Sequence, residues 1–380
     1  MKIHTHIVYI LFIAFCFIAC NEGTSRRSKV KAEMPELEFH SFKLPIDYTS
    51  QVLDGFCHPT STRIGEKDCM LIYNNLMHTI EVISLTEQKA LKQIKLRMEG
   101  DNRIGEVRGV FLHGKHFILR TSFGIHRIDD EGNILSTWSG DVFLKANDEL
   151  EGFSIMIPEL MTYFNLYNFA GYDEQNGLIT FSIYKWKKEN EEYPKKILVL
   201  DCNTCEVVDV IDVFCSERMK QEPRLGILGS VNSIPHGNRV IYNFPASADV
   251  YVYDRMEKTT QRYSPESDFA EPYYRCKKRD DEEGLHTGHY FPLCYDALHN
   301  CFWRVQQRPQ AERQGIAGKA FSIVRLSSDF QVTDEHIIPT DKEILPYPLF
   351  TEDGLMLNRP YRQENEEKVI CFYGIKLYHH

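Results

Sequence analysis

The chain is short of basic residues and of tryptophan. Its 380 residues include 44 Lys and Arg against 54 Asp and Glu, a formal net charge of −10, and it has Trp at only 3 positions. A nucleic-acid-binding protein needs a concentrated basic face to neutralise phosphate, so this charge balance argues against that class. With 43% hydrophobic and 26% charged residues, the composition also excludes intrinsic disorder and collagen-like structure. The length suits one large domain or two medium ones.

Long hydrophobic runs are missing after the N-terminus. The single run is the apolar stretch 7–19 behind Lys2, which is shorter than the roughly 20 residues that cross a bilayer but fits a secretory signal. It ends in Phe17-Ile18-Ala19-Cys20, which resembles the lipobox of bacterial lipoproteins, where the cysteine is lipidated and becomes the mature N-terminus. We therefore predict lipidation of Cys20, and an ordinary cleaved signal peptide is the alternative.

These features divide the chain into three parts. We predict a signal peptide at 1–19, a polar and flexible lipidated tether at 20–35, and one folded domain at 36–380. The lipid on Cys20 would hold the domain in the bacterial cell envelope, at the outer membrane, with the periplasmic or surface-facing side left open.

Internal repetition indicates the fold. Aromatic residues make up 12% of the chain, which favours strands because aromatic side chains pack well on a pleated surface. A four-stranded pattern of strand, tight turn, strand, loop, strand, tight turn, strand recurs roughly every 45 to 75 residues, as in a β-propeller. The third strands of the repeats are expected at 79–85, 125–129, 197–201, 250–254, 322–326 and 369–373. We predict an all-β, six-bladed propeller. Seven blades and a two-domain β protein are the alternatives.

The last repeat has three strands before the chain ends. Residues 37–44 near the N-terminus alternate between apolar and polar side chains, as an edge strand does. We predict that this N-terminal strand completes the last blade and so removes an exposed sheet edge.

Three sequence features together carry a family resemblance. They are the lipobox, the segment Gly105–Val110 before the second blade and the turn Arg127–Asn133. With these features the chain resembles the six-bladed propeller lipoproteins of Bacteroides-type envelopes, and within them a family catalogued only as a domain of unknown function. The resemblance implies a fold and a location, and it implies no catalytic residue.

Loop lengths predict which face of the propeller is functional. Turns from the first to the second strand and from the third to the fourth are tight, whereas the connections on the other face carry the insertions. Function concentrates in such loops, so we expect a binding site on the loop-rich face. The second strands end there in six equivalent positions, four of them cationic, which could form a ring that binds a carboxylate, a sulfated sugar or an acidic peptide. These binding candidates are Asn74, Arg120, Lys185, Asn243, Arg304 and Arg359. The alternative is that several point outwards or pair with loop acids.

Cysteine and histidine patterns give weaker signals. Cys202 and Cys205 form a single CxxC, which is too little for a zinc site, and a local disulfide or two free thiols is the simpler reading. Cys294 and Cys301 flank a hairpin turn and are the best candidate disulfide. His286-x-x-His289 follows an acidic run, but a solvated loop explains this segment as well. We predict no metal and no cofactor.

Two classes of function follow. No GxSxG, P-loop or HExxH sequence occurs, so we expect a binding or scaffold propeller that recognises a glycan, a peptide or an envelope protein. Its other partner would be the membrane, through the lipid, and no nucleic acid is expected. The alternative is a carbohydrate-active hydrolase or lyase at the channel mouth, because catalytic acids from different blades leave no linear motif. Whether the protein is an enzyme stays open, with binding favoured.

Overall fold

The three-dimensional structure is a computed structural model. It describes residues 38–43, 59–75, 77–97, 104–105, 107–121, 124–155, 171–185, 195–221, 226–275, 288–309, 320–339, 344, 348–358 and 369–376. The predicted signal peptide, Cys20 and the tether lie outside these ranges. No helix within them is long and apolar enough to cross a membrane.

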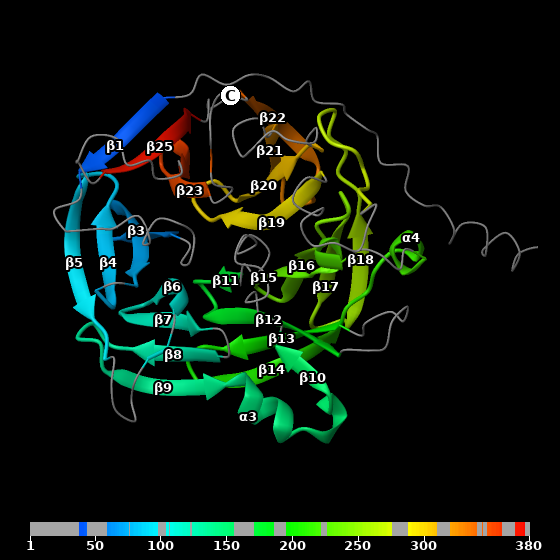
Figure 1. Cartoon of the computed structure of the whole chain (residues 1–380), viewed down its shortest axis with the longest axis horizontal. Coiled ribbons are helices and arrows are strands. Elements are labelled where there is room, and N and C mark those ends of the chain that lie inside the picture. Colours follow the sequence, from blue (N-terminus) through cyan, green and yellow to red (C-terminus); the bar gives the residue numbers. More distant parts are fainter. Residues whose placement is uncertain are drawn as a thin grey trace, which may run out of the picture.

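Six antiparallel sheets are arranged in a ring around a central axis (Figure 1). Five sheets have four strands each, and the sheet of the third blade has five. This is the predicted six-bladed β-propeller, and no seventh blade is needed to place the described strands. The predicted third strands are confirmed, because each lies as the third strand of its own sheet.

The strands follow each other from the axis outwards in every blade. Blade 1 contains β2 (Thr60–Ile64), β3 (Lys67–Asn74), β4 (Thr79–Ser84) and β5 (Lys89–Lys95). Blade 2 contains β6 (Val107–His113), β7 (His116–Thr121), β8 (Gly124–Ile128) and β9 (Ile134–Ser139). Blade 3 contains β10 (Phe153–Ile155), β11 (Tyr172–Asp173), β12 (Leu178–Lys185), β13 (Lys195–Asp201) and β14 (Glu206–Asp212).

The second half of the ring repeats this order. Blade 4 contains β15 (Asn232–His236), β16 (Arg239–Asn243), β17 (Val250–Asp254) and β18 (Thr259–Tyr263). Blade 5 contains β19 (His289–Asp296), β20 (Cys301–Gln307), β21 (Phe321–Leu326) and β22 (Val332–Ile338). Blade 6 contains β23 (Pro348–Thr351), β24 (Gly354–Asn358), β25 (Val369–Lys376) and β1 (Glu38–Lys43). The short helices are α3 (Gly140–Lys145), η1 (Asp148–Leu150), α4 (Glu217–Lys220) and η4 (Gly226–Gly229).

The N-terminal strand closes the ring, as predicted. β1 pairs antiparallel with β25, so that Glu38 lies opposite Gly374 and Lys43 opposite Val369. The first described strand and the last therefore share one blade (Figure 1). Pairing β1 with the last blade gives the outer side of β25 a partner, which a three-stranded blade would leave exposed.

The core consists of clusters between neighbouring blades. Side chains alternate between the two faces of a strand, so each blade packs one set against the preceding blade and the other against the next. Phe111 of blade 2 and Ile179 of blade 3 share one such cluster, and Trp303 of blade 5 and Leu357 of blade 6 share another. Each blade therefore depends on its neighbours to bury its faces.

Blade 3 departs from the regular pattern at its innermost position. Two short strands, β10 and β11, take the place of one, and they pair with opposite ends of β12. Tyr172 lies opposite Ile179, and Phe153 lies opposite Lys185. The long connection between blades 2 and 3 thus contains α3, η1 and β10, and it brings Tyr172 and Asp173 to the axis.

Candidate functional site

One hollow in the structure is lined by all six blades. We call the face that bears the first-to-second-strand turns the hairpin face, and the opposite one the loop face. The hollow opens on the hairpin face, has a volume of about 600 Å³ and is lined by innermost strands together with hairpin turns. This volume is within the range of small-molecule sites. The described hollow therefore lies on the face opposite to the predicted loop-rich one.

Two pairs of aromatic side chains line part of the hollow. The rings of Phe111 and Tyr172 contact each other with centroids 4.8 Å apart, and those of His236 and Tyr295 with centroids 4.3 Å apart. The first pair joins blades 2 and 3, and the second pair joins blades 4 and 5. Burial lowers the pKa of His236, which favours the neutral imidazole. The hollow thus has two aromatic walls.

Two of the lining carboxylates are held by backbone amides. Asp173 accepts hydrogen bonds from the N–H and the side-chain amide of Asn176, at 3.1 and 2.8 Å, and from Gly237 N–H of blade 4 at 2.7 Å. Asp68 accepts one from Glu352 N–H of blade 6 at 2.9 Å. Both residues are at least nine-tenths buried. They tie the hairpin turns of adjacent blades together.

Glu174 is the lining carboxylate that accepts no amide within the described part of the chain. It follows Asp173 in the hairpin turn of blade 3 and accepts the hydroxyl of Thr62 in blade 1, at 3.3 Å on Oε1 and 3.4 Å on Oε2. The residue is exposed, yet loss of water around its carboxyl raises the pKa of Glu174, and Thr62 and His113 oppose that shift. Among the described lining residues, Glu174 is the acid best placed to meet a ligand.

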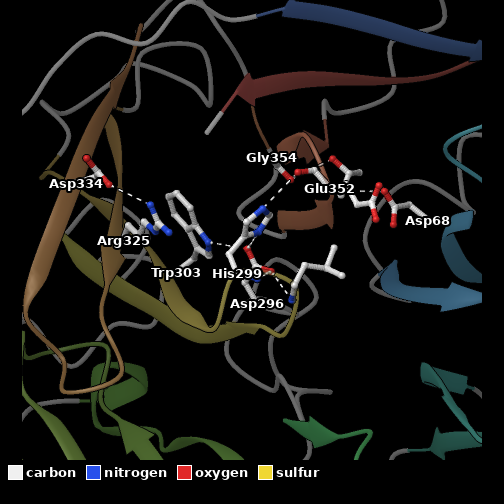
Figure 2. Close-up of polar contacts among 10 residues, drawn as sticks. Asp68, Asp296, His299, Trp303, Arg325, Asp334, Glu352 and Gly354 are labelled. Carbon is white, nitrogen blue, oxygen red and sulfur yellow. Dashed lines mark hydrogen bonds and ion pairs between the residues drawn. The ribbon is translucent and has the colours of Figure 1, made fainter. Parts of the chain in front are cut away.

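Blade 5 contributes a second type of link beside the hollow (Figure 2). The fully buried Asp296 accepts hydrogen bonds from the backbone N–H of Leu298 and His299, from the His299 ring at 2.7 Å and from the Trp303 indole at 3.3 Å. The other ring nitrogen of His299 lies 3.4 Å from the Glu352 carbonyl oxygen in blade 6. The Glu352 turn is therefore held from blade 5 by His299 and from blade 1 by Asp68.

None of the five described residues of the predicted ring lines the hollow, and three of them, Arg120, Asn243 and Arg304, contact a neighbouring blade. Asn243 donates to the Phe291 carbonyl at 3.1 Å, Lys185 donates to the Glu151 carbonyl at 2.7 Å, and Asn74 accepts from Met77 N–H at 3.1 Å. The reason is geometric, because side chains of a second strand face the neighbouring blades rather than the axis. Arg359 and Cys20 lie outside the described residues. A cationic ring at the loop face stays a prediction.

The two described arginines of that set are buried against aromatic rings. Arg120 is 6% exposed and lies 5.0 Å from the centre of the Phe181 ring in blade 3. Arg304 is 2% exposed, lies 4.5 Å from the Tyr290 ring and donates to the Ala248 carbonyl at 2.8 Å. Burial lowers the pKa of Arg120 to about 10 and also lowers that of Arg304. Both groups are charged at neutral pH.

The predicted disulfide between Cys294 and Cys301 is wrong, because both are free thiols. In the ladder, Cys294 lies opposite Trp303 and Cys301 lies opposite Asp296, so the two cysteines are diagonal neighbours. Diagonal Cβ atoms are about 7 to 8 Å apart, whereas a disulfide needs about 3.5 to 4.5 Å. Cys202 and Cys205 are also free thiols, which was one of the two readings of the CxxC.

Several predicted features fall outside the described residues. They include His286, the acidic run before it and most of the loop-face insertions. Within the described ranges, no group of three His, Cys, Asp or Glu side chains could hold a metal ion.

Sequence reasoning missed the residues that line the hollow. Asp173, Glu174, His236 and Leu298 belong to hairpin tips or lie next to them, on the face where the sequence predicts only tight turns. A usable signal was present, because Tyr172-Asp173-Glu174 and Tyr295-Asp296-Ala297 place a tyrosine before an acid at equivalent tips of blades 3 and 5.

Comparisons with known proteins identify the fold. A family described as a domain of unknown function, DUF4221, matches residues 50–337. The crystal structure of a member of that family from Bacteroides vulgatus is 18% identical, with a TM-score of 0.66 over 91% of this chain and 99% of its own. No curated protein matches.

Two further solved structures are less similar to this chain. A calcium-binding protein, regucalcin, from Agrobacterium tumefaciens is 11% identical, with a TM-score of 0.47 over 91% of this chain and 96% of its own. A luciferin-regenerating enzyme is 10% identical, with a TM-score of 0.45 over 90% of this chain and 98% of its own. At these TM-scores the similarities say nothing about a ligand of the present chain.

Proposed function

This chain belongs to the DUF4221 family, a domain of unknown function, and from that premise we propose that it is a binding propeller that takes a compact ligand in the hollow of its hairpin face. The observation that carries the proposal is the hollow itself, about 600 Å³ in volume and lined by all six blades. Ligand sites favour concave surfaces with apolar walls and a few polar groups, which is the composition of these walls. A sugar, a short peptide terminus or a side chain of an envelope protein are ligands of suitable size.

The state of the lining acids favours binding over hydrolysis. A glycoside hydrolase needs two carboxyl groups that exchange protons or attack the substrate during each turnover. The carboxylate oxygens of Asp173 and Asp68 accept backbone N–H groups, so their lone pairs hold the hairpin turns and are less available to attack a substrate or take its proton. Glu174 would then act alone among the described lining acids, which suits recognition better than acid–base catalysis.

The same proposal places the propeller in the cell envelope, held by lipid on Cys20. The apolar run and the lipobox support this location. The test is incorporation of a labelled fatty acid into the full chain expressed in a Gram-negative host. We expect label in the unaltered chain and none in Cys20→Ser. Equal labelling of both would refute the anchor.

A substitution that fills the hollow tests whether the ligand binds there. Ala297 is an exposed lining residue, so Ala297→Trp narrows the hollow without disturbing the core. Leu135→Trp on the exposed outer strand of blade 2 is the matched control, because Leu135 is 44% exposed and lies away from the axis. A panel of saccharides, amines and short peptides is screened by thermal shift with the full chain in detergent. We expect a ligand whose stabilisation survives Leu135→Trp and disappears in Ala297→Trp. Retained stabilisation in Ala297→Trp would place binding elsewhere.

A further inference from the structure

Charge is unevenly distributed over the walls of the hollow. Among the described lining residues, the acids are Asp68, Asp173 and Glu174 and the one permanent cation is Arg63. Arg63 forms an ion pair with Glu352 of blade 6, which offsets its charge. His236 adds no positive charge at neutral pH because burial lowers its pKa. The described walls therefore favour a positively charged guest over an anion.

The aromatic walls point to the same chemistry. Tyr172 and Tyr295 come from blades 3 and 5 and line the hollow, each backed by a second ring, Phe111 and His236 respectively. The face of an aromatic ring attracts a cation, and aromatic cages are a common way to bind ammonium groups. An ammonium group gains from ring faces and a carboxylate together, whereas a neutral ligand of the same shape gains only from apolar contact.

We propose that the hollow binds a ligand through an ammonium group, with Glu174 as the residue that meets its charge. This inference rests on the proposed function, because it names the ligand class of the same hollow. Glu174 is singled out from the other lining acids because, within the described residues, Thr62 is its one side-chain donor, at 3.3 and 3.4 Å, so its carboxylate keeps acceptor capacity for a guest. The carboxylate of Asp173 already accepts hydrogen bonds from Asn176 and Gly237.

Binding of a cation should then depend on pH. Desolvation raises the pKa of Glu174, so acidification protonates it earlier than an ordinary glutamate and removes the attraction. The titratable groups around it are His113 at the end of β6, and Tyr172 and Asp173 of β11, the strand that precedes its turn. Affinity should fall as pH falls through the range in which Glu174 is protonated. In Glu174→Gln that part of the pH dependence should be absent.

The experiment compares two probes of one shape. Choline carries a quaternary ammonium group, and 3,3-dimethylbutan-1-ol is its neutral analogue. The affinity of each probe is measured by calorimetric titration of the full chain in detergent at several pH values. The proteins compared are the unaltered chain, Glu174→Gln and the control Glu257→Gln, which changes an exposed acid outside the hollow. We expect choline to bind at least about tenfold more tightly than the alcohol, and this preference to be lost in Glu174→Gln and kept in Glu257→Gln.

Each outcome separates the two proposals. Equal affinity for choline and the alcohol, or a preference that Glu174→Gln leaves intact, overturns the ammonium ligand. If Ala297→Trp abolishes binding of a neutral saccharide while choline does not bind, the ammonium ligand is wrong and the hollow is still the binding site. If ligands bind and Ala297→Trp has no effect on any of them, the hollow itself is refuted.

Discussion

The hairpin face and the loop face of this propeller bury opposite charges by different means. On the hairpin face, Asp173 and Asp296 are satisfied by backbone N–H groups of their own or adjacent turns. Towards the loop face, Arg120 and Arg304 lie over aromatic rings, and Arg304 donates to a carbonyl oxygen. An amide-bound carboxylate fixes the backbone that binds it, whereas a ring face accepts a cation from many directions. The hairpin face should therefore be the more rigid and the more sensitive to substitution.

Asp296 should be the most costly hairpin-face acid to remove. Asp296→Ala deletes the acceptor of four donors in a fully buried site, including the Trp303 indole and the His299 ring. Stranded buried donors are expensive, so we expect a loss of about 3 to 5 kcal/mol in the free energy of unfolding, measured by urea denaturation. Asp254→Ala is the control, because Asp254 also accepts two turn amides but is only partly buried. An equal loss in both variants would show that burial is not the cause.

Two neighbouring acids on the same turn provide the next test. Asp173→Ala removes the acceptor of Gly237 N–H and so breaks a link between blades 3 and 4, which should cost about 2 kcal/mol by urea denaturation. Glu174→Ala removes a carboxylate that accepts one hydroxyl, and we expect almost no change in stability. If Glu174→Ala proved as destabilising as Asp173→Ala, the division between a structural and a ligand-binding acid would fail.

Removal of a loop-face cation should cost less than removal of Asp296, although both residues are fully buried. Arg304→Met keeps contact with the Tyr290 ring, ends the burial of a charge and leaves the Ala248 carbonyl oxygen without its donor. The nearby Glu335 keeps donors of its own. The end of charge burial stabilises the fold and the unpaired carbonyl oxygen destabilises it, so we expect the free energy of unfolding to change by less than about 1 kcal/mol. Thermal or urea unfolding measures this. A loss as large as that of Asp296→Ala would remove the contrast between the two faces.

The parts of the fold that the sequence predicts are those with a periodic pattern. The recurring third strands and the alternation in 37–44 are local patterns with a period, so the six blades and the closing strand β1 followed directly from them. The divided inner strand of blade 3 did not, because β10 and β11 are three and two residues long and carry no periodic signal.

The candidate site was harder to predict for a physical reason. Arg120 and Arg304 are conspicuous because cations recur at strand ends, but the direction of a second-strand side chain depends on the neighbouring blade, which one strand cannot specify. Asp173 and Glu174 are adjacent in sequence and look alike, yet their partners, Gly237 and Thr62, come from different blades. Asp173 becomes a structural acid and Glu174 an exposed one only when the closed ring brings those blades together.

The smallest expected effect is the pH dependence that Glu174 gives to stability. Desolvation raises the pKa of Glu174 in the folded protein, so the fold binds that proton more tightly than the unfolded chain does. Its contribution is complete at low pH and is lost as pH rises through the pKa in the fold. Glu174→Gln has no such loss, so its unfolding free energy relative to the unaltered chain should increase from acid to neutral pH. Urea denaturation of Glu174→Gln and of the unaltered chain at several pH values checks this, and Glu257→Gln should show no such increase. If the difference in unfolding free energy between Glu174→Gln and the unaltered chain shrinks towards neutral pH, the carboxyl is not desolvated.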